Sequence, residues 1–168
     1  MTFSNPLLHR PTRPFPKSIA IIGAGTIGPD IGYYLKTAIP DLKLTLVDVA
    51  QSALDQARQR FEGYARKAVE RKRMTPTEAA RVTENLHTTL DYAAIADADW
   101  FIEAATEDIA LKRRIFARIE AVARPDAIIT SNTSSIPAEV IFADMKHPER
   151  TTVTHFFAPA WYNPCVEV

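Results

Sequence analysis

Three glycines at fixed spacing constrain this chain most, in the run Gly23-Ala24-Gly25-Thr26-Ile27-Gly28. The run directly follows a short β-branched apolar segment, residues 18–22, which predicts a strand. The next residues, 26–36, can form a helix, and the apolar residues 43–49 predict a second strand. A strand, a glycine turn, a helix and a strand in this order predict the right-handed βαβ unit that begins a parallel sheet.

The glycine spacing is the one that binds a dinucleotide in such a unit. Gly23 permits the tight turn, Gly25 lets the backbone approach a pyrophosphate, and Gly28 lets the helix pack closely on the strand. Thr26 and Ile27 lie at the start of the helix, whose N-terminus would face the phosphates. The alternative is a purely structural glycine turn. The position of the turn between a strand and a helix favours cofactor binding over that alternative.

Asp48 supports the same interpretation and indicates which cofactor binds. It ends the second predicted strand, about 20 residues after Gly28, where a carboxylate accepts hydrogen bonds from the adenosine ribose. This carboxylate would repel a 2′-phosphate, and no arginine is among Val49, Ala50 and Gln51, which follow it. We therefore expect NAD rather than NADP, with FAD as a weaker alternative.

Helical and extended patterns continue to alternate along the rest of the chain. Helices are predicted over 52–73, from Thr75 to about 85, and over 109–122; strands are predicted over 87–90, 100–104, 127–131 and 151–155. Thr75, Pro76 and Glu78 have the spacing of a capping box with proline in the first turn. The predicted fold class is α/β, a Rossmann-type doubly wound, mostly parallel sheet with helices on both faces, over residues 18–168.

Composition argues against several classes of function. The 20 basic and 20 acidic residues cancel, so no net charge favours nucleic acid or an anionic membrane as a partner. No apolar run approaches the roughly 18 residues of a membrane helix. Cys165 is the single cysteine, which excludes an internal disulfide and fits a reducing, cytoplasmic compartment. No metal site is predicted.

Residues 1–17 differ from the rest of the chain. They contain four prolines and three basic residues, and no acidic residue precedes Asp30. We expect a disordered leader here. An organelle transit peptide is the alternative, which the prolines oppose because such peptides form amphipathic helices.

Polar side chains follow the later predicted strands at their carboxyl ends, where ligands bind in open α/β sheets. Glu103 and Glu107 follow one strand, residues 131–135 (SNTSS) follow the next, and His155 ends the last. We expect these side chains to gather at one edge of the sheet.

Five stretches together resemble the NAD-binding N-terminal domain of the L-3-hydroxyacyl-CoA dehydrogenase family. They are IAIIGAGTIG, LTLVDV, IEAATEDIALKRRIF, AIITSNTSSIPA and HFFAP followed by VEV, in the family's order and with nearly its spacings. The resemblance runs from about Lys17 to the last residue. It implies hydride transfer between the C3 hydroxyl carbon of a 3-hydroxyacyl-CoA and NAD, as in fatty acid β-oxidation.

The resemblance also implies roles for individual residues. His155 matches the family's catalytic base and Glu167 its carboxylate partner, a pairing that fixes the imidazole tautomer and stabilises the imidazolium. Ser134 matches the serine that binds the substrate oxygen, and Asn132 lies near the nicotinamide end. The remaining matches are Glu107 and Lys112, which would contact NAD, and Arg71, which stands where a lysine meets the phosphates of coenzyme A.

Simpler interpretations of these residues stay open. A lone histidine at a strand end is often only a satisfied polar residue, and Ser134 or Ser135 can cap a helix over 136–142. Arg71 belongs to a basic helix end that can equally be a solvated face. Cys165 next to the predicted site is a further, weaker candidate nucleophile.

The chain departs from the family pattern at several positions. Tyr64 replaces a serine in the region that contacts coenzyme A, Ala158 replaces the asparagine of HFFNP, and residues 161–163 add bulk before Glu167. Relatives continue into a helical domain that dimerises and completes the active site. We therefore expect a homodimer through such a domain, and an isolated chain that binds NAD but turns over poorly.

Two other functions remain open at this stage. Related dehydrogenases act on free hydroxy acids such as gulonate or carnitine, and they share the glycine turn and the SNTSS loop. A non-catalytic NAD-binding module is the other possibility, although it would not require His155, Glu167 and Ser134.

Overall fold

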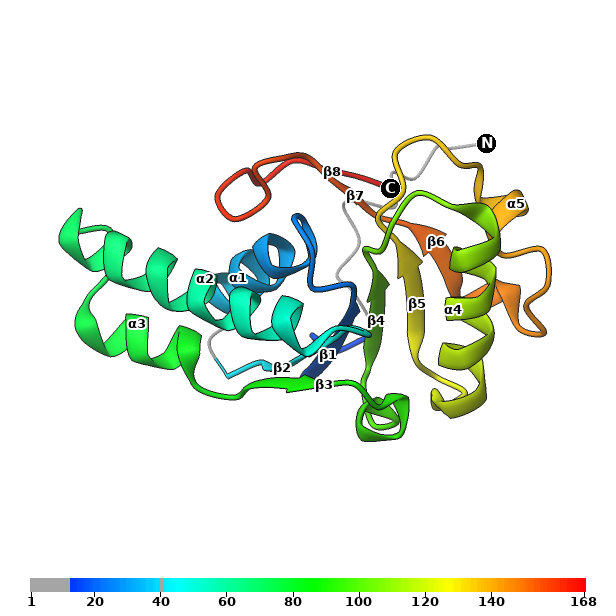
Figure 1. Cartoon of the computed structure of the whole chain (residues 1–168), viewed down its shortest axis with the longest axis horizontal. Helices are drawn as coiled ribbons and strands as arrows, with labels where there is room; N and C mark the ends of the chain where they lie inside the picture. The colour runs from blue at the N-terminus through cyan, green and yellow to red at the C-terminus, as the bar shows by residue number, and fades with distance from the viewer. Residues whose placement is uncertain (1–12, 40) are drawn as a thin grey trace, which may run out of the picture.

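A six-stranded sheet forms the centre of the protein (Figure 1). The computed structural model describes residues 13–39 and 41–168. The elements are, in chain order, β1 (Ser18–Ile22), α1 (Gly28–Ala38), β2 (Lys43–Val47), α2 (Gln51–Glu70), α3 (Pro76–Thr83), β3 (Leu86–Thr89), β4 (Trp100–Glu103), α4 (Ile109–Val122), β5 (Ile128–Ser131), α5 (Ala138–Ile141), β6 (Thr151–Val153), β7 (His155–Phe156) and β8 (Val166–Glu167). The predicted α/β class is confirmed.

The sheet is doubly wound around β1. Its strand order is β3-β2-β1-β4-β5-β6, and every neighbouring pair runs parallel. In the register, Ile19 of β1 lies beside Leu44 of β2 and Trp100 of β4. The chain therefore winds outward from β1 in one direction and from β4 in the other, and the point between these strands is where ligands bind in such sheets.

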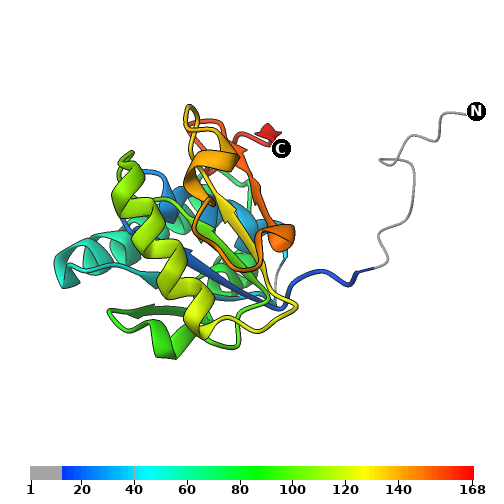
Figure 2. The same ribbon diagram turned by 90° about the vertical axis from the view of Figure 1, so that its right-hand side faces the viewer.

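Helices cover the two faces of the sheet in separate groups. Helices α1, α2 and α3 lie on one face, where Ile19 and Ile21 join the core, and α4 and α5 lie on the other, where Ala20 and Ile22 do so (Figures 1 and 2). Because β1 is buried on both faces from Ile19 to Ile22, this part of its sequence is apolar instead of alternating.

The last predicted strand, 151–155, is wrong as a single element. Strand β6 ends at Val153, and His155–Phe156 forms β7 in a separate two-stranded antiparallel sheet with β8. The reason is that β5 already ends at Ser131, whose carbonyl accepts the Thr154 N–H at 2.9 Å. Beyond that bond β5 offers no further strand residue, and the Asn132 side-chain oxygen accepts the Phe156 N–H at 2.8 Å instead.

At the helix starts, one predicted cap is confirmed and another is wrong. The capping box at α3 is confirmed, since Thr75 and Glu78 exchange side-chain bonds to each other's N–H. A cap by Ser134 or Ser135 is wrong, because α5 begins after Pro137 without a side-chain cap. The Thr133 hydroxyl accepts the N–H groups of residues 135 and 136 and forms that turn instead.

Helix α2 ends at Glu70, three residues before the predicted end at Arg73. Lys72 has a φ of 54°, a left-handed conformation that a helix cannot continue through. Arg71 and Arg73 therefore lie in the turn after α2.

Residues 1–12 of the expected leader lie outside the described residues. Residues 13–17 have no regular structure but are bound to the domain. The Arg13 guanidinium donates to the Asp126 carbonyl at 2.6 Å, and the Asp99 carboxylate accepts the N–H groups of Lys17 and Ser18. Across residues 13–39 and 41–168, the structure contains no helix whose length and apolar character would let it cross a membrane.

Two helical glycines give a matched test of this packing. A Cβ on Gly32 of α1 would lie 2.7 Å from Leu44 Cδ2 and 3.1 Å from Phe61 Cζ, both in the core, whereas one on Gly63 of α2 would meet nothing within 4 Å. We expect Gly32→Ala to lower the free energy of unfolding by about 1–3 kcal/mol through overpacking. Gly63→Ala should raise it by about 0.5–1 kcal/mol through helix propensity. Urea denaturation measures both, and shifts in the same direction would contradict the packing described.

Candidate functional site

The glycine turn between β1 and α1 forms one wall of the site. Gly23 has a φ of 111°, and a Cβ there would lie 2.6 Å from the Ala104 carbonyl oxygen. A Cβ on Gly28 would lie 1.9 Å from the Gly23 carbonyl oxygen. These two glycines are therefore required by the protein's own packing. A Cβ on Gly25 would meet nothing within 4 Å, so Gly25 instead leaves open space in which a ligand can approach the backbone.

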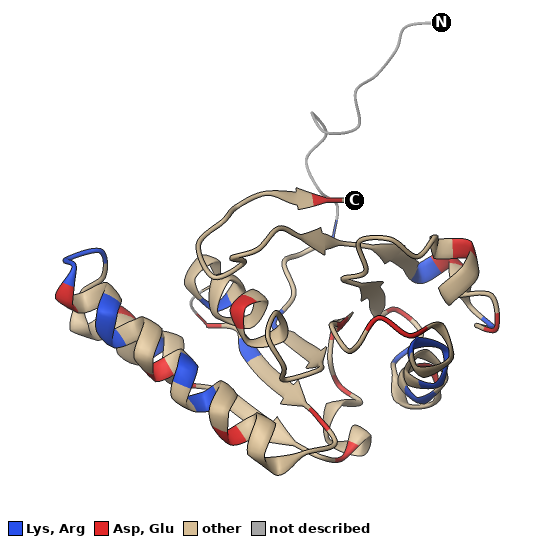
Figure 3. Ribbon diagram, turned by 45° about the horizontal axis from the view of Figure 1, so that its top comes forward, with Lys and Arg blue, Asp and Glu red and all other residues tan. Residues whose placement is uncertain are grey.

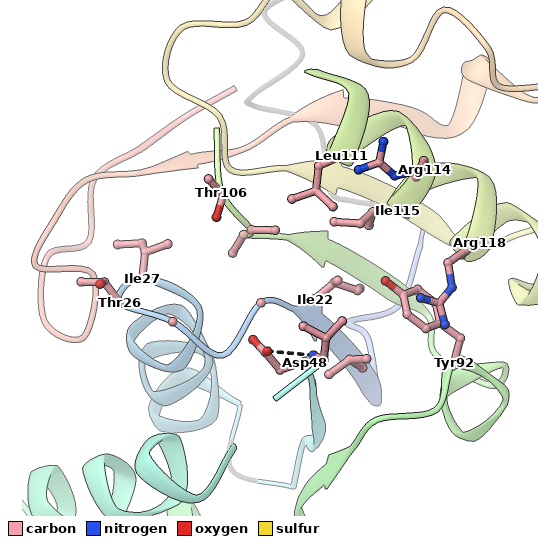
Figure 4. Close-up of a pocket in the computed structure, with 16 residues that line it drawn as sticks. Ile22, Thr26, Ile27, Asp48, Tyr92, Thr106, Leu111, Arg114, Ile115 and Arg118 are labelled. Atoms are coloured by element: carbon pink, nitrogen blue, oxygen red, sulfur yellow. Dashed lines mark hydrogen bonds between the residues drawn. The ribbon is translucent and has the colours of Figure 1, made fainter. Parts of the chain in front are cut away.

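Asp48 joins the end of β2 to this turn (Figure 4). Its Oδ2 accepts the Ala24 N–H at 2.8 Å, and its Oδ1 accepts the N–H groups of Val49 and Ala50 at 2.7 and 3.0 Å. A carboxylate has about four lone-pair sites, so these bonds orient the group and still leave capacity for ribose hydroxyls.

A cavity of about 620 Å³ lies over the turn and Asp48. The predicted residues Gly23, Gly25, Thr26, Ile27 and Asp48 line it, and Figure 4 shows Arg114, Arg118 and Tyr92 around the same space.

Tyr92, Arg114 and Arg118 did not emerge from the sequence as site residues. The Arg118 guanidinium carbon lies 3.9 Å from the centroid of the Tyr92 ring, a cation–π contact. The available signal was the spacing of Arg114 and Arg118, four residues apart on one face of α4, but that spacing is equally typical of a solvated helix face.

A second cavity, of about 320 Å³, adjoins the first and shares Ile27, Ala104 and Ala105 with it. The structure brings together here the predicted residues that follow different strands: Glu107, Lys112, Asn132, Ser134 and His155. Ala158 also lines this cavity. Both cavities therefore open at the carboxyl edge of the sheet, beside β1 and β4.

The hairpin of β7 and β8 pairs His155 with Glu167 directly across the two strands. His155 Nδ1 lies 3.5 Å from Glu167 Oε2, at ion-pair range but beyond a normal hydrogen bond, and it is buried without a hydrogen-bond partner in the described chain. The histidine side chain is 20% exposed and the carboxylate 71%. Nδ1 thus faces the carboxylate, and Nε2 has no hydrogen bond within residues 13–39 and 41–168.

A buried ion pair supports the edge where the two cavities meet. The Lys112 ammonium, 1% exposed, donates to both oxygens of Glu103 at 2.8 and 2.9 Å and lies 3.1 Å from Glu107 Oε2. Glu103 also accepts the Ser131 hydroxyl at 2.6 Å and the Ala105 N–H at 2.7 Å. Protein acceptors thus occupy the Lys112 donors, and Glu107 is the member of this group that reaches the surface.

Glu107 is held by several donors. Burial opposes its ionisation, but hydrogen bonds from the Thr133 hydroxyl and from Lys112 outweigh that effect and lower the pKa of the Glu107 carboxyl. The group is therefore a carboxylate with a fixed orientation at neutral pH. The SNTSS loop contributes Thr133 to this contact and Ser134 to the cavity.

Arg71 lies apart from both cavities. It lines a smaller hollow of about 130 Å³ at the end of α2, with Tyr64, Lys67, Arg73 and Trp161. Figure 3 shows the basic residues gathered at this end of the helix. Cys165 is exposed and lines neither cavity. Among the described residues, no group of three or more His, Cys, Asp or Glu side chains is arranged to hold a metal ion.

The solved structures similar to this chain include two that are named 3-hydroxybutyryl-CoA dehydrogenases. A 3-hydroxybutyryl-CoA dehydrogenase from Escherichia coli K12 matches 87% of this chain and 30% of its own, with 34% identity and a TM-score of 0.83. The match with FadB2 from M. tuberculosis covers 90% of this chain and 53% of FadB2, with 33% identity and a TM-score of 0.84. The match with the (S)-3-hydroxybutyryl-CoA dehydrogenase PaaH1 from Ralstonia eutropha covers 87% of this chain and 51% of PaaH1, with 27% identity and a TM-score of 0.82.

These relatives are longer proteins. The chain spans about half the length of two of them and less than a third of the other. The family model described as "3-hydroxyacyl-CoA dehydrogenase, NAD binding domain" matches residues 18–168. Together with the glycine turn and Asp48, these matches establish that the chain belongs to the 3-hydroxyacyl-CoA dehydrogenase family, of which it contains the NAD-binding domain.

Proposed function

We propose that the chain contributes the cofactor and acid–base halves of a dehydrogenase for 3-hydroxyacyl-CoA thioesters, with His155 as the base. The observation that carries the proposal is the position of the His155 imidazole, which lines the cavity next to the glycine turn and has Glu167 behind it. The overall reaction converts a 3-hydroxyacyl-CoA and NAD⁺ into a 3-ketoacyl-CoA, NADH and a proton. NAD supplies the hydride acceptor when it is bound.

The open space above Gly25 and the oriented Asp48 carboxylate fit a dinucleotide. We propose that the turn, through Gly23, Gly25, Thr26, Ile27 and Gly28, holds the pyrophosphate, and that Asp48 accepts the ribose hydroxyls. Glu107, supported by Lys112, would contact the nicotinamide half together with Asn132.

His155 would remove the proton from the substrate hydroxyl through Nε2. Its Nδ1 then faces the Glu167 carboxylate, whose negative charge would stabilise the imidazolium as it forms. In the reverse direction the same nitrogen returns the proton to the ketone oxygen. Ser134, whose exposed side chain lies in the same cavity, would donate a hydrogen bond to the reacting oxygen.

A thioester of coenzyme A is supported by two observations. Two of the similar structures are 3-hydroxybutyryl-CoA dehydrogenases, and basic residues including Arg71 gather at the end of α2, where a polyanion would be attracted. A dehydrogenase of free hydroxy acids and a non-catalytic NAD-binding module are the outcomes against which this proposal is tested.

Asp48 should determine the preference for NADH over NADPH. We expect Asp48→Asn to reduce the ratio of the two affinities by about tenfold, equivalent to about 1.4 kcal/mol, because the carboxylate no longer repels a 2′-phosphate. The control is Asp41→Asn. It removes the same charge just before β2, whereas Asp48 directly follows β2, and it should leave the ratio unchanged. Fluorescence titration measures both affinities, and an unaltered ratio in Asp48→Asn would exclude this role.

His155 should affect chemistry without affecting cofactor binding. We expect His155→Asn to lower the rate of NADH formation from 3-hydroxybutyryl-CoA by about 10²–10⁴-fold, the usual contribution of a general base. The Kd for NADH should stay within about twofold. The control is His147→Asn, since His147 is an exposed histidine paired with Glu149. Because turnover is expected to be slow, the chain is used in excess over substrate in single-turnover experiments.

The same assay separates the alternatives. Faster oxidation of free 3-hydroxybutyrate, carnitine or gulonate than of the thioester would favour a dehydrogenase of free acids. Tight NADH binding with no oxidation of any of them would favour a non-catalytic module. An unchanged rate in His155→Asn would contradict the assignment of the base.

A further inference from the structure

Arg60 of α2 reaches across to the glycine turn. Its Nη1 donates to the Thr26 carbonyl oxygen at 2.6 Å, and its Nη2 donates to the Gly25 carbonyl oxygen at 3.0 Å. The guanidinium thus binds two successive peptide groups of the turn with its two terminal nitrogens, a geometry that a planar fork suits and a single ammonium does not.

A buried carboxylate fixes the guanidinium from the other side. Asp30, in the first turn of α1, accepts from Arg60 Nη1 at 3.3 Å and from the Tyr64 hydroxyl at 2.9 Å, both at Oδ1. Burial raises the pKa of the Asp30 carboxyl, whereas the bonds from Tyr64 and Arg60 lower it. Because Asp30 is almost inaccessible to water, these two donors hold it in place.

Tyr64 is itself held by aromatic neighbours. The Trp161 ring stacks on it at 5.0 Å between centroids and 17° between planes, and the Tyr33 ring meets it edge-on at 5.2 Å. Burial and the bond to Asp30 raise the pKa of Tyr64 to about 12, so its hydroxyl keeps the proton that it donates. Trp161 lies in the loop of the β7–β8 hairpin, which is therefore joined to the same cluster.

The geometry of the peptide bond determines what this contact does. In a trans peptide the C=O of one residue and the N–H of the next point in opposite directions. Arg60 holds the carbonyls of Gly25 and Thr26 on the side of α2, so the N–H groups of Thr26 and Ile27 point the other way. Neither N–H donates to an acceptor within the described part of the chain.

We propose that Arg60 is a positioning residue for the cofactor: by binding the carbonyls of Gly25 and Thr26, it orients the N–H groups of Thr26 and Ile27 toward the pyrophosphate. Its side chain is 32% exposed. Its positive charge would also attract the phosphates, and we expect orientation to be the larger effect. The proposal rests on NAD binding and is independent of the reaction proposed for His155.

The test compares Arg60→Met with Arg58→Met. Arg58 lies on the same helix and donates to the Thr88 hydroxyl at 3.3 Å, away from the turn, so its loss removes an equal charge. We expect the Kd for NADH to rise about tenfold or more in Arg60→Met, because charged hydrogen bonds are lost, and by less than about twofold in Arg58→Met. In the absence of ligand, amide hydrogen exchange over residues 24–28 should become faster only in Arg60→Met.

Two ligands distinguish positioning from general damage to the site. ADP-ribose contains the pyrophosphate and adenosine does not. In NMR titrations, Arg60→Met should therefore weaken the binding of ADP-ribose and leave the binding of adenosine unchanged. The proposal would be overturned if the affinities for both ligands fell equally. It would also be overturned if Arg60→Met bound NADH as tightly as the unmodified chain.

Arg60→Lys separates orientation from charge and serves if Arg60→Met does not fold. Lysine keeps the charge but cannot bind both carbonyls in a fork, so most of the loss in NADH affinity should remain. Parental affinity and parental amide exchange in Arg60→Lys would show that charge alone suffices and would overturn the proposal. None of these measurements depends on turnover, so their failure is distinct from a failure of the dehydrogenase assignment.

Discussion

The buried pair of Glu103 and Lys112 is the interaction on which the rest of the site depends. Removing two charges from water costs several kcal/mol for each, and here the cost is offset because both carboxylate oxygens contact the ammonium and also accept from Ser131 and Ala105. Losing either partner would leave the other charge buried, a change that typically destabilises a protein by about 3–5 kcal/mol. The pair thereby ties the end of β4 to α4 and β5, and it fixes Glu107 through Lys112.

Different glycines of the turn serve packing and ligand binding. Gly23 and Gly28 are glycines because the chain passes too close to itself for a Cβ, whereas Gly25 is free of such contacts. In the site proposed for the pyrophosphate, backbone N–H groups would contact the anion, and side chains from elsewhere in the fold support the peptide groups of the turn. Asp48 provides that support from β2 and Arg60 from α2.

Much of the fold could be predicted from the sequence, because local signals and tertiary packing agree. Strand β1 and helix α4 have the predicted bounds, since strong apolar patterns end at clear turn residues. The cofactor half of the site followed from glycine spacing and Asp48, and the roles of His155 and Glu167 came from family resemblance. The β7–β8 pairing could not be predicted, since strands of two residues show no periodicity. Arg60 was also missed. The sequence pattern of a charged helix face is the same whether its arginine is solvated or donates to a backbone carbonyl.

The separate hairpin has a consequence for how such a site can diverge. The residues proposed to hold the dinucleotide directly follow strands of the main sheet, where a shift of register would disturb every neighbouring strand. His155 and Glu167 stand on two short strands joined by residues 157–165, outside that register. Insertions and substitutions near Ala158 in this connection can reshape the wall of the smaller cavity without a shift of register in the main sheet. Because Phe156 and Ala160 of this segment are buried in the core and Trp161 stacks on Tyr64, changes elsewhere in it would also reach the cluster that holds the glycine turn.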